Sequence, residues 1–155
     1  MKHLPARRGF SLIELMIVMA IMLVIAAIAT HNYRKAMMHA NETSAVATFK
    51  TLHTAQVQYQ TQYGRFAPSL TELGPPQNGE STAQAADLID GNLAVGEASG
   101  YRFSMTGNAA GYVISAVPLV YNTTGSLSFY SDQTMRLRQT KGSEPATVQS
   151  PLVRR

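Results

Sequence analysis

The acidic side chain inside a long apolar run is the clearest candidate for chemistry in this sequence. Residues 10–29 contain only two polar side chains, Ser11 and Glu14. A charged side chain near the centre of a bilayer costs about 3 kcal/mol on insertion scales, so such a group persists when it has a partner. Glu14 is therefore predicted to form an ion pair where water is excluded. The alternative is that the carboxylate lies near the lipid headgroups, where it is tolerated without a function.

Other residue types that perform chemistry are scattered or absent. The histidines have no metal-ligand spacing such as H-E-x-x-H, and the sequence lacks a phosphate loop, a dinucleotide fingerprint and a G-x-S-x-G elbow. These histidines are His3, His31, His39 and His53. The sequence has no cysteine, which excludes disulfides and thiolate metal sites. We therefore expect no enzyme activity, no metal and no cofactor.

The apolar run that holds Glu14 is long enough to cross a membrane. At 1.5 Å per residue, twenty residues span about 30 Å, the thickness of one hydrocarbon core. The flanking basic residues favour a cytoplasmic N-terminus. These are Lys2, Arg7 and Arg8 before the run and Arg34 and Lys35 after it. A plain signal anchor and a secretory signal cleaved after Ala29 are alternatives, but neither gives Gly9 or Glu14 a purpose.

The sequence RRGFSLIEL, residues 7–15, resembles the class III signal of type IV pilins and type II secretion pseudopilins. In that family a membrane-embedded peptidase cuts after the glycine and the new amino group is methylated. The resemblance implies a leader over residues 1–9, cleavage between Gly9 and Phe10, and N-methylation of Phe10. It also implies that Glu14 pairs with the amino terminus of a neighbouring subunit.

The same resemblance implies a function and a place in the cell. The chain is expected to be a structural subunit stored in the bacterial inner membrane and assembled, with the help of a membrane platform, into a filament outside the cytoplasm. A pseudopilin of a type II secretion system is the main alternative. A secreted domain released after Ala29 and a DNA-uptake pilin are others; the latter would bind phosphates through basic side chains. Those side chains are Arg136, Arg138, Lys141, Arg154 and Arg155.

The chain beyond the apolar run continues as a helix. No proline or glycine occurs from Phe10 to Tyr63, so one helix of roughly 54 residues is predicted, ending at Gly64. Its membrane and assembly half covers residues 10–33, and its amphipathic half covers residues 34–64. The amphipathic pattern has a three- and four-residue spacing. Its members are Val46, Phe49, Leu52, Gln56, Tyr59 and Tyr63.

Two positions in this helix depart from the resembling family. Many of its members have a glycine in the middle of the apolar run and a proline near its end, whereas Leu23 and His31 occupy the matching positions here. Because neither residue breaks a helix, a more continuous helix is expected.

The remaining chain predicts an α+β head in which an antiparallel sheet of three to four strands packs on the second half of the helix, as in the pilin fold. A loop region covers residues 65–100, the sheet covers residues 101–141, and a flexible tail covers residues 142–155. Alternation and turn signals define the strands. They are placed at residues 101–105, 112–117, 127–130 and 135–137.

Charge is unevenly distributed along the chain. Much of the formal net charge of +4 comes from the three basic residues before the apolar run, which lowers the expectation of nucleic-acid binding. Residues 67–101 have a net charge of −5, and residues 102–155 have a net charge of +4. These are either two solvated faces or complementary surfaces of neighbouring heads, and added salt should weaken the latter.

Overall fold

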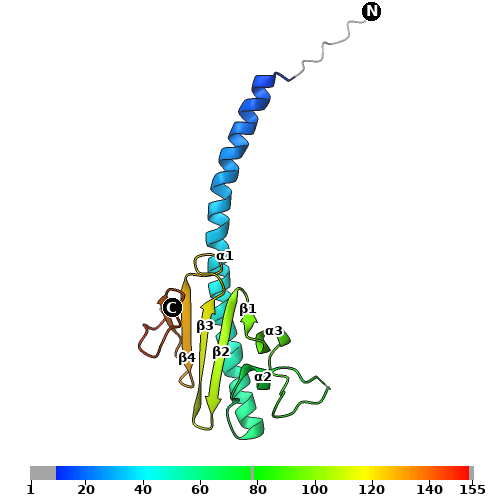
Figure 1. Cartoon of the computed structure of the whole chain (residues 1–155), viewed down its shortest axis with the longest axis vertical. Coiled ribbons are helices and arrows are strands. Elements are labelled where there is room, and N and C mark those ends of the chain that lie inside the picture. The colour runs from blue at the N-terminus through cyan, green and yellow to red at the C-terminus, as the bar shows by residue number, and fades with distance from the viewer. Residues whose placement is uncertain (1–9, 78, 154–155) are drawn as a thin grey trace, which may run out of the picture. The chain divides into compact units, whose positions relative to one another are not determined.

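The computed structural model (Figure 1) describes residues 10–77 and 79–153. The chain divides into two compact units, residues 1–36 and residues 37–155. The helices are α1 (Leu12–Tyr63), α2 (Leu70–Leu73) and α3 (Gly91–Ala94). The strands are β1 (Glu97–Ala98), β2 (Tyr101–Asn108), β3 (Gly111–Pro118), β4 (Leu127–Asp132) and β5 (Arg138–Lys141).

The predicted long helix is confirmed. α1 runs over 52 residues without interruption, and it passes through Leu23 and His31 as helix. It ends where glycine can adopt a left-handed conformation: Gly64 has φ +71° and donates its N–H to the carbonyl of Gln60 at 2.9 Å. The start at Leu12 lies two residues later than predicted.

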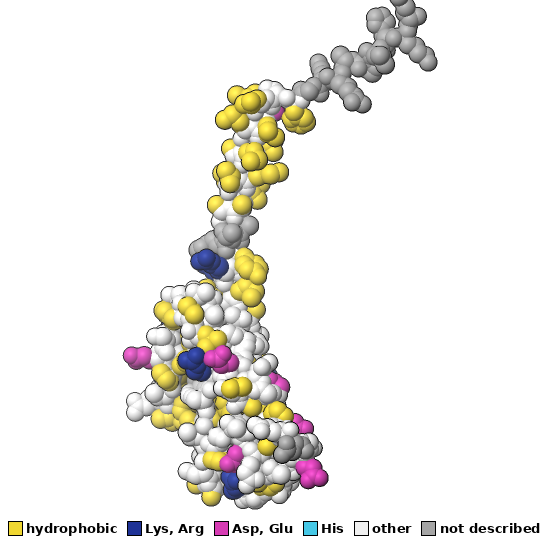
Figure 2. All heavy atoms as spheres, turned by 45° about the vertical axis from the view of Figure 1, so that its right-hand side comes forward, with side chains coloured by type: hydrophobic (Ala, Val, Ile, Leu, Met, Phe, Trp, Pro, Cys, Tyr) yellow, Lys and Arg dark blue, Asp and Glu magenta, His cyan; other side chains and the backbone are white. Residues whose placement is uncertain are grey.

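In the first unit, α1 presents apolar side chains that no other described residue of the unit covers. The described side chains of residues 10–28 are all exposed, and Figure 2 shows hydrophobic atoms along this part of the chain. By length and composition, α1 can cross a membrane. The apolar run therefore has no core of its own in this unit.

In the second unit, one face of α1 packs on the sheet. Phe49, Leu52 and Tyr59 are buried at the predicted helical spacing. The ring of Phe49 contacts Phe103 on β2 and Phe129 on β4, with centroid distances of 5.8 and 6.3 Å. These aromatic contacts join strands on both sides of β3 to one turn of the helix. The α+β fold class is confirmed.

The sheet is an antiparallel meander. In the part of the chain that the structure describes, five strands follow the order β1-β2-β3-β4-β5. Three to four strands were expected. β1 has only two residues, too few to show alternation, and β5 lies at Arg138–Lys141 instead of residues 135–137. Met135 has φ +58° and belongs to the turn before β5, while the polar sequence RQTK gives no alternation signal.

The segment after β5 differs from the predicted flexible tail. Ala146 is buried, and residues 150–153 lie along β5. The N–H of Gln139 donates to the carbonyl of Pro151 at 2.9 Å, and the N–H of Val153 donates to the carbonyl of Leu137 at 3.0 Å. These backbone bonds satisfy an edge strand that would otherwise have open donors and acceptors.

Gln56 is the polar residue in the helical pattern of apolar side chains. It is buried, and it connects α1 to the chain that follows the helix. Its side-chain amide donates to the carbonyl of Ala67 at 3.0 Å and accepts from the N–H of Ala67 at 2.9 Å. Both backbone groups of a buried residue are thereby satisfied by one side chain. Gln56 thus fixes the chain that leaves α1, a role that periodicity alone does not reveal.

Candidate functional site at the start of the long helix

The candidate site lies in the first turn of α1. Ser11 directly precedes the helix, and the Glu14 carboxylate accepts a hydrogen bond from the Ser11 N–H at 2.9 Å. The Ser11 carbonyl accepts from the N–H of Leu15 at 3.2 Å, as a residue at the N-cap position does. A glutamate three residues after a serine that returns to the serine N–H is half of a capping box. The spacing Ser11-x-x-Glu14 could have revealed this contact from the sequence.

The electrostatics of this turn suit a carboxylate. The first N–H groups of an α-helix have no partners within the helix, and the helix dipole places partial positive charge at this end. Glu14 is the acidic residue of the first turn. The carboxylate is therefore stabilised locally before any second charge approaches it.

Apolar side chains surround this carboxylate without covering it. Phe10 is 84% exposed and Leu12 is 75% exposed. Within the described residues of the first unit, no side chain packs over them. Phe10 and Glu14 thus lie at the start of one uncovered apolar helix, whereas Gly9, the third predicted processing residue, lies outside the described residues.

The structure also locates the basic residues that were considered for nucleic-acid binding. Arg138 and Lys141 lie on β5, and Arg136 lies in the turn before it. Arg138 donates to the carbonyl of Ser150 at 2.8 Å. Arg154 and Arg155 lie outside the described residues. Across residues 10–77 and 79–153, no group of three or more histidine or acidic side chains could hold a metal ion.

One histidine is buried in a polar cluster of the head. Nδ1 of His53 lies 2.8 Å from the Tyr112 hydroxyl oxygen, and Nε2 lies 2.9 Å from the Ser131 hydroxyl oxygen. The Ser131 hydroxyl donates to the carbonyl of Arg136 at 3.1 Å, so it accepts from His53 Nε2–H. Nδ1 is then the acceptor for the Tyr112 hydroxyl, which defines a neutral tautomer. Sequence spacing gave no sign of this cluster.

The burial of His53 makes the stability of the head depend on pH. Desolvation lowers the pKa of His53, and the charge of Asp132 opposes this shift to a smaller extent. The folded head therefore favours neutral His53. Its contribution to stability is present above the ordinary pKa of about 6.5 and is lost as the pH falls from there toward the lowered folded pKa.

We expect the melting temperature of the detergent-solubilised full chain to fall between pH 7.5 and pH 5, as His53 takes up a proton against its burial. His53→Gln keeps polar atoms near the Tyr112 and Ser131 hydroxyls but cannot take up this proton. The melting temperature of the variant should fall by fewer degrees than that of the wild type over the same pH interval. An equal loss in both proteins would show that another group controls the pH dependence.

Comparison with known proteins identifies the motif at this end of the chain. Residues 4–30 match the family model described as the prokaryotic N-terminal methylation motif. The chain is also similar to the type IV major pilin protein PilA of Myxococcus xanthus (strain DK1622), with 34% identity over 96 residues. This alignment covers 61% of the present chain and 44% of the relative, so the chain spans less than half of that protein's length. No solved structure matches the chain significantly.

The fold and the motif together define a class of protein: an α+β protein whose long apolar helix begins inside an N-terminal methylation motif. Over 96 residues the chain is similar to a type IV major pilin, and residues 4–30 give it the N-terminal methylation motif.

Proposed function

We propose that this chain is a structural subunit of a type IV pilus or a related filament. The observation that carries the proposal is the uncovered apolar surface of α1 around a single carboxylate. Such a surface is stable only when lipid or other apolar helices cover it. The similarity to a protein named as a major pilin supports helices of further copies as the final cover.

The proposed processing gives the first turn of α1 a second charge. Cleavage after Gly9 makes Phe10 the first residue, and methylation leaves its amino group positive. That amino group lies one residue before Ser11, whose N–H already donates to Glu14. During assembly the carboxylate pairs with the Phe10 amino group of a neighbouring subunit, and in the dry core of a filament this pair compensates two charges at once.

The subunit is stored in the bacterial inner membrane as a single span with a cytoplasmic N-terminus. Prepilin peptidase and an inner-membrane assembly platform are its proposed partners, together with further copies of a pilin. The resulting filament is extracellular or periplasmic. A type II secretion pseudopilin would undergo the same processing, but its filament would stay in the periplasm. Immunogold labelling of intact cells distinguishes the two, because only a surface pilus is labelled without permeabilisation.

The first test is the intact mass and N-terminal sequence of the mature protein from membranes. We expect a chain that begins at Phe10 and is heavier than its sequence by one methyl group. A start at Thr30 would identify an ordinary secreted domain. A start at Met1 would identify a membrane anchor without processing, and both outcomes would contradict the proposal.

A further inference from the structure

Two opposite edges of the head carry opposite charges. We define the acidic edge as β1, α3 and the loop before α3; its exposed carboxylates are those of Glu80, Asp87, Asp90 and Glu97. We define the basic edge as β5, the turn before it and the adjacent part of α1; its cations are Lys50, Arg136, Arg138 and Lys141. β1 and β5 are the outermost strands of the sheet, so the full width of the meander separates the edges. Figure 2 brings the α2–α3 side forward and shows acidic side chains gathered there.

Most of these charges form no ion pair with another described residue. In the described part of the chain, the ion pairs are Arg65–Glu72 and Arg102–Glu97, with N–O distances of 3.0 and 3.1 Å. Only the second involves an edge residue, and both of its side chains are more than half exposed. Exposed pairs of this kind contribute little to stability. Both edges thus present charge that the separate head leaves uncompensated.

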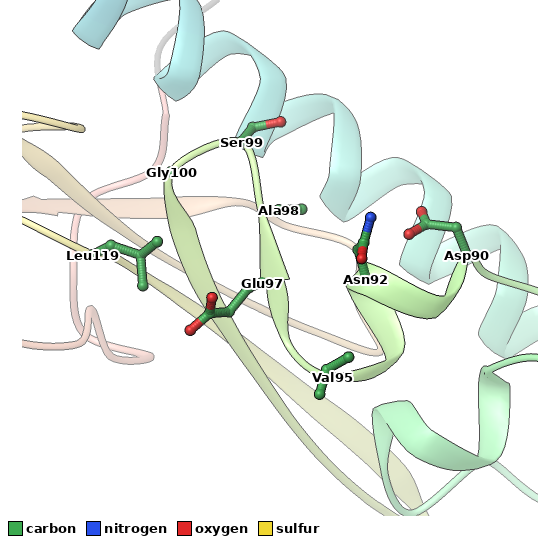
Figure 3. Close-up of a pocket in the computed structure, with 8 residues that line it drawn as sticks. All are labelled: Asp90, Asn92, Val95, Glu97, Ala98, Ser99, Gly100 and Leu119. Atoms are coloured by element: carbon green, nitrogen blue, oxygen red, sulfur yellow. The ribbon is translucent and has the colours of Figure 1, made fainter.

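The acidic edge also has an exposed apolar side chain. Val95 is 82% exposed, and Figure 3 shows it at the turn between α3 and β1, near Glu97. It lines an open depression together with Asp90, Glu97 and Leu119. An exposed valine between carboxylates gives this edge a mixed apolar and acidic character.

The basic edge has a groove of its own and the opposite charge. A groove of about 440 Å³ lies between α1 and the chain around β5, and its lining includes Lys50, Met135, Leu137 and Leu152. Met135 is 53% exposed. This edge therefore combines an apolar groove with cations, whereas the acidic edge combines an open depression, lined in part by Val95, with anions. The two edges differ in the sign of their charge.

We propose that the acidic edge of one head docks on the basic edge of the head of a second copy of this chain. The charge complementarity favours this occupant, because each copy supplies both halves of the contact. A symmetric dimer that used either edge twice would place like charges opposite each other. A contact between two different surfaces of the same molecule leaves one of each surface free on every pair of copies. Further copies can therefore be added, and the contact can repeat along a helical assembly. The inference rests on the proposed filament function and assigns the head contact within it.

The test uses full-length chains expressed in cells that lack the native gene, with filaments sheared from the surface and quantified. The double variant of the acidic edge, Glu80→Lys with Glu97→Lys, reverses the charge at two positions. Neither carboxylate caps a helix. Arg136→Glu with Lys141→Glu reverses two exposed cations. Each double variant should yield about tenfold fewer filaments or less, because like charges then face each other across the contact. The quadruple variant should recover the yield, since both edges have exchanged sign. The matched control is Glu144→Lys, which lies outside the acidic edge and should assemble normally.

A second measurement does not depend on the folding of any variant. Wild-type sheared filaments should release subunits at a lower temperature as NaCl rises from about 0.1 M toward about 1 M, because the screening length falls from about 10 Å to about 3 Å and the exposed charges of the head contact weaken. A release temperature that does not fall with salt, or a quadruple variant that stays as poor as the doubles, would overturn the head contact while leaving the filament intact. DNA binding lost only in the Arg136/Lys141 variant, with normal assembly of both doubles, would reassign the basic edge to nucleic acid. An absence of filaments from the wild type would instead refute the proposed function, and the head contact with it.

Discussion

Glu14→Gln should abolish filament assembly while leaving the helix start intact. Glutamine at this position of a capping box can still accept the hydrogen bond from the Ser11 N–H. It cannot compensate the positive amino group of a neighbouring subunit. Removing one partner of a buried ion pair costs about 3–5 kcal/mol. At about 1.4 kcal/mol per factor of ten, each subunit addition becomes weaker by about two to four orders of magnitude.

The measurement is the quantity of filaments sheared from cells, with the mature N-terminus of the membrane-stored subunit determined in parallel. We expect normal processing with no filaments. Glu144→Gln is the matched control, because it removes the same charge from an exposed position in the head that lies outside the acidic edge. Normal filaments in Glu14→Gln would mean that this carboxylate serves only as a helix cap. Filaments lost in Glu14→Ala but retained in Glu14→Gln would identify the hydrogen bond as the essential contact.

The long helix could be predicted because its signals are local. Residues 10–63 contain neither proline nor glycine, and a glycine stands where the helix must stop. The buried face of the second half also follows the helical period, so Phe49, Leu52 and Tyr59 were placed correctly. The predicted start lies two residues early, because the extent of the apolar run does not mark the first helical residue, whereas the capping pattern of Ser11 and Glu14 does.

The features missed in the head depend on contacts between distant residues. Gln56 appears in the sequence as a polar interruption, and only its bonds to Ala67 explain why it is buried. His53 finds its partners on two different strands, at Tyr112 and Ser131. The chain after β5 reads as a polar tail, yet its backbone bonds to the edge strand determine its path. Side-chain type and local period carry no information about such pairings.

A substitution at the proposed cleavage site is expected to have the second large effect on filament assembly. Gly9→Val should block cleavage, so that the full chain starting at Met1 accumulates in the membrane and no filaments form. A peptidase must bring its catalytic groups against the backbone of the cleaved bond, and glycine allows this close approach because it has no side chain. A β-branched residue adds bulk and stiffness directly beside the carbonyl that is attacked. The loss should be nearly complete, because assembly requires the Phe10 amino group that only cleavage creates.

Ala6→Val is the matched control, since it adds the same kind of side chain within the predicted leader but away from the cleaved bond. We expect it to be processed to a chain that begins at Phe10. Immunoblotting of membranes resolves the two forms by their difference of nine residues. If Gly9→Val were processed like wild type, the cleaved bond would lie elsewhere and the amino group would not arise next to Ser11. Glu14 would then lose its proposed partner, because the pairing depends on a positive charge at the first turn of a neighbouring helix.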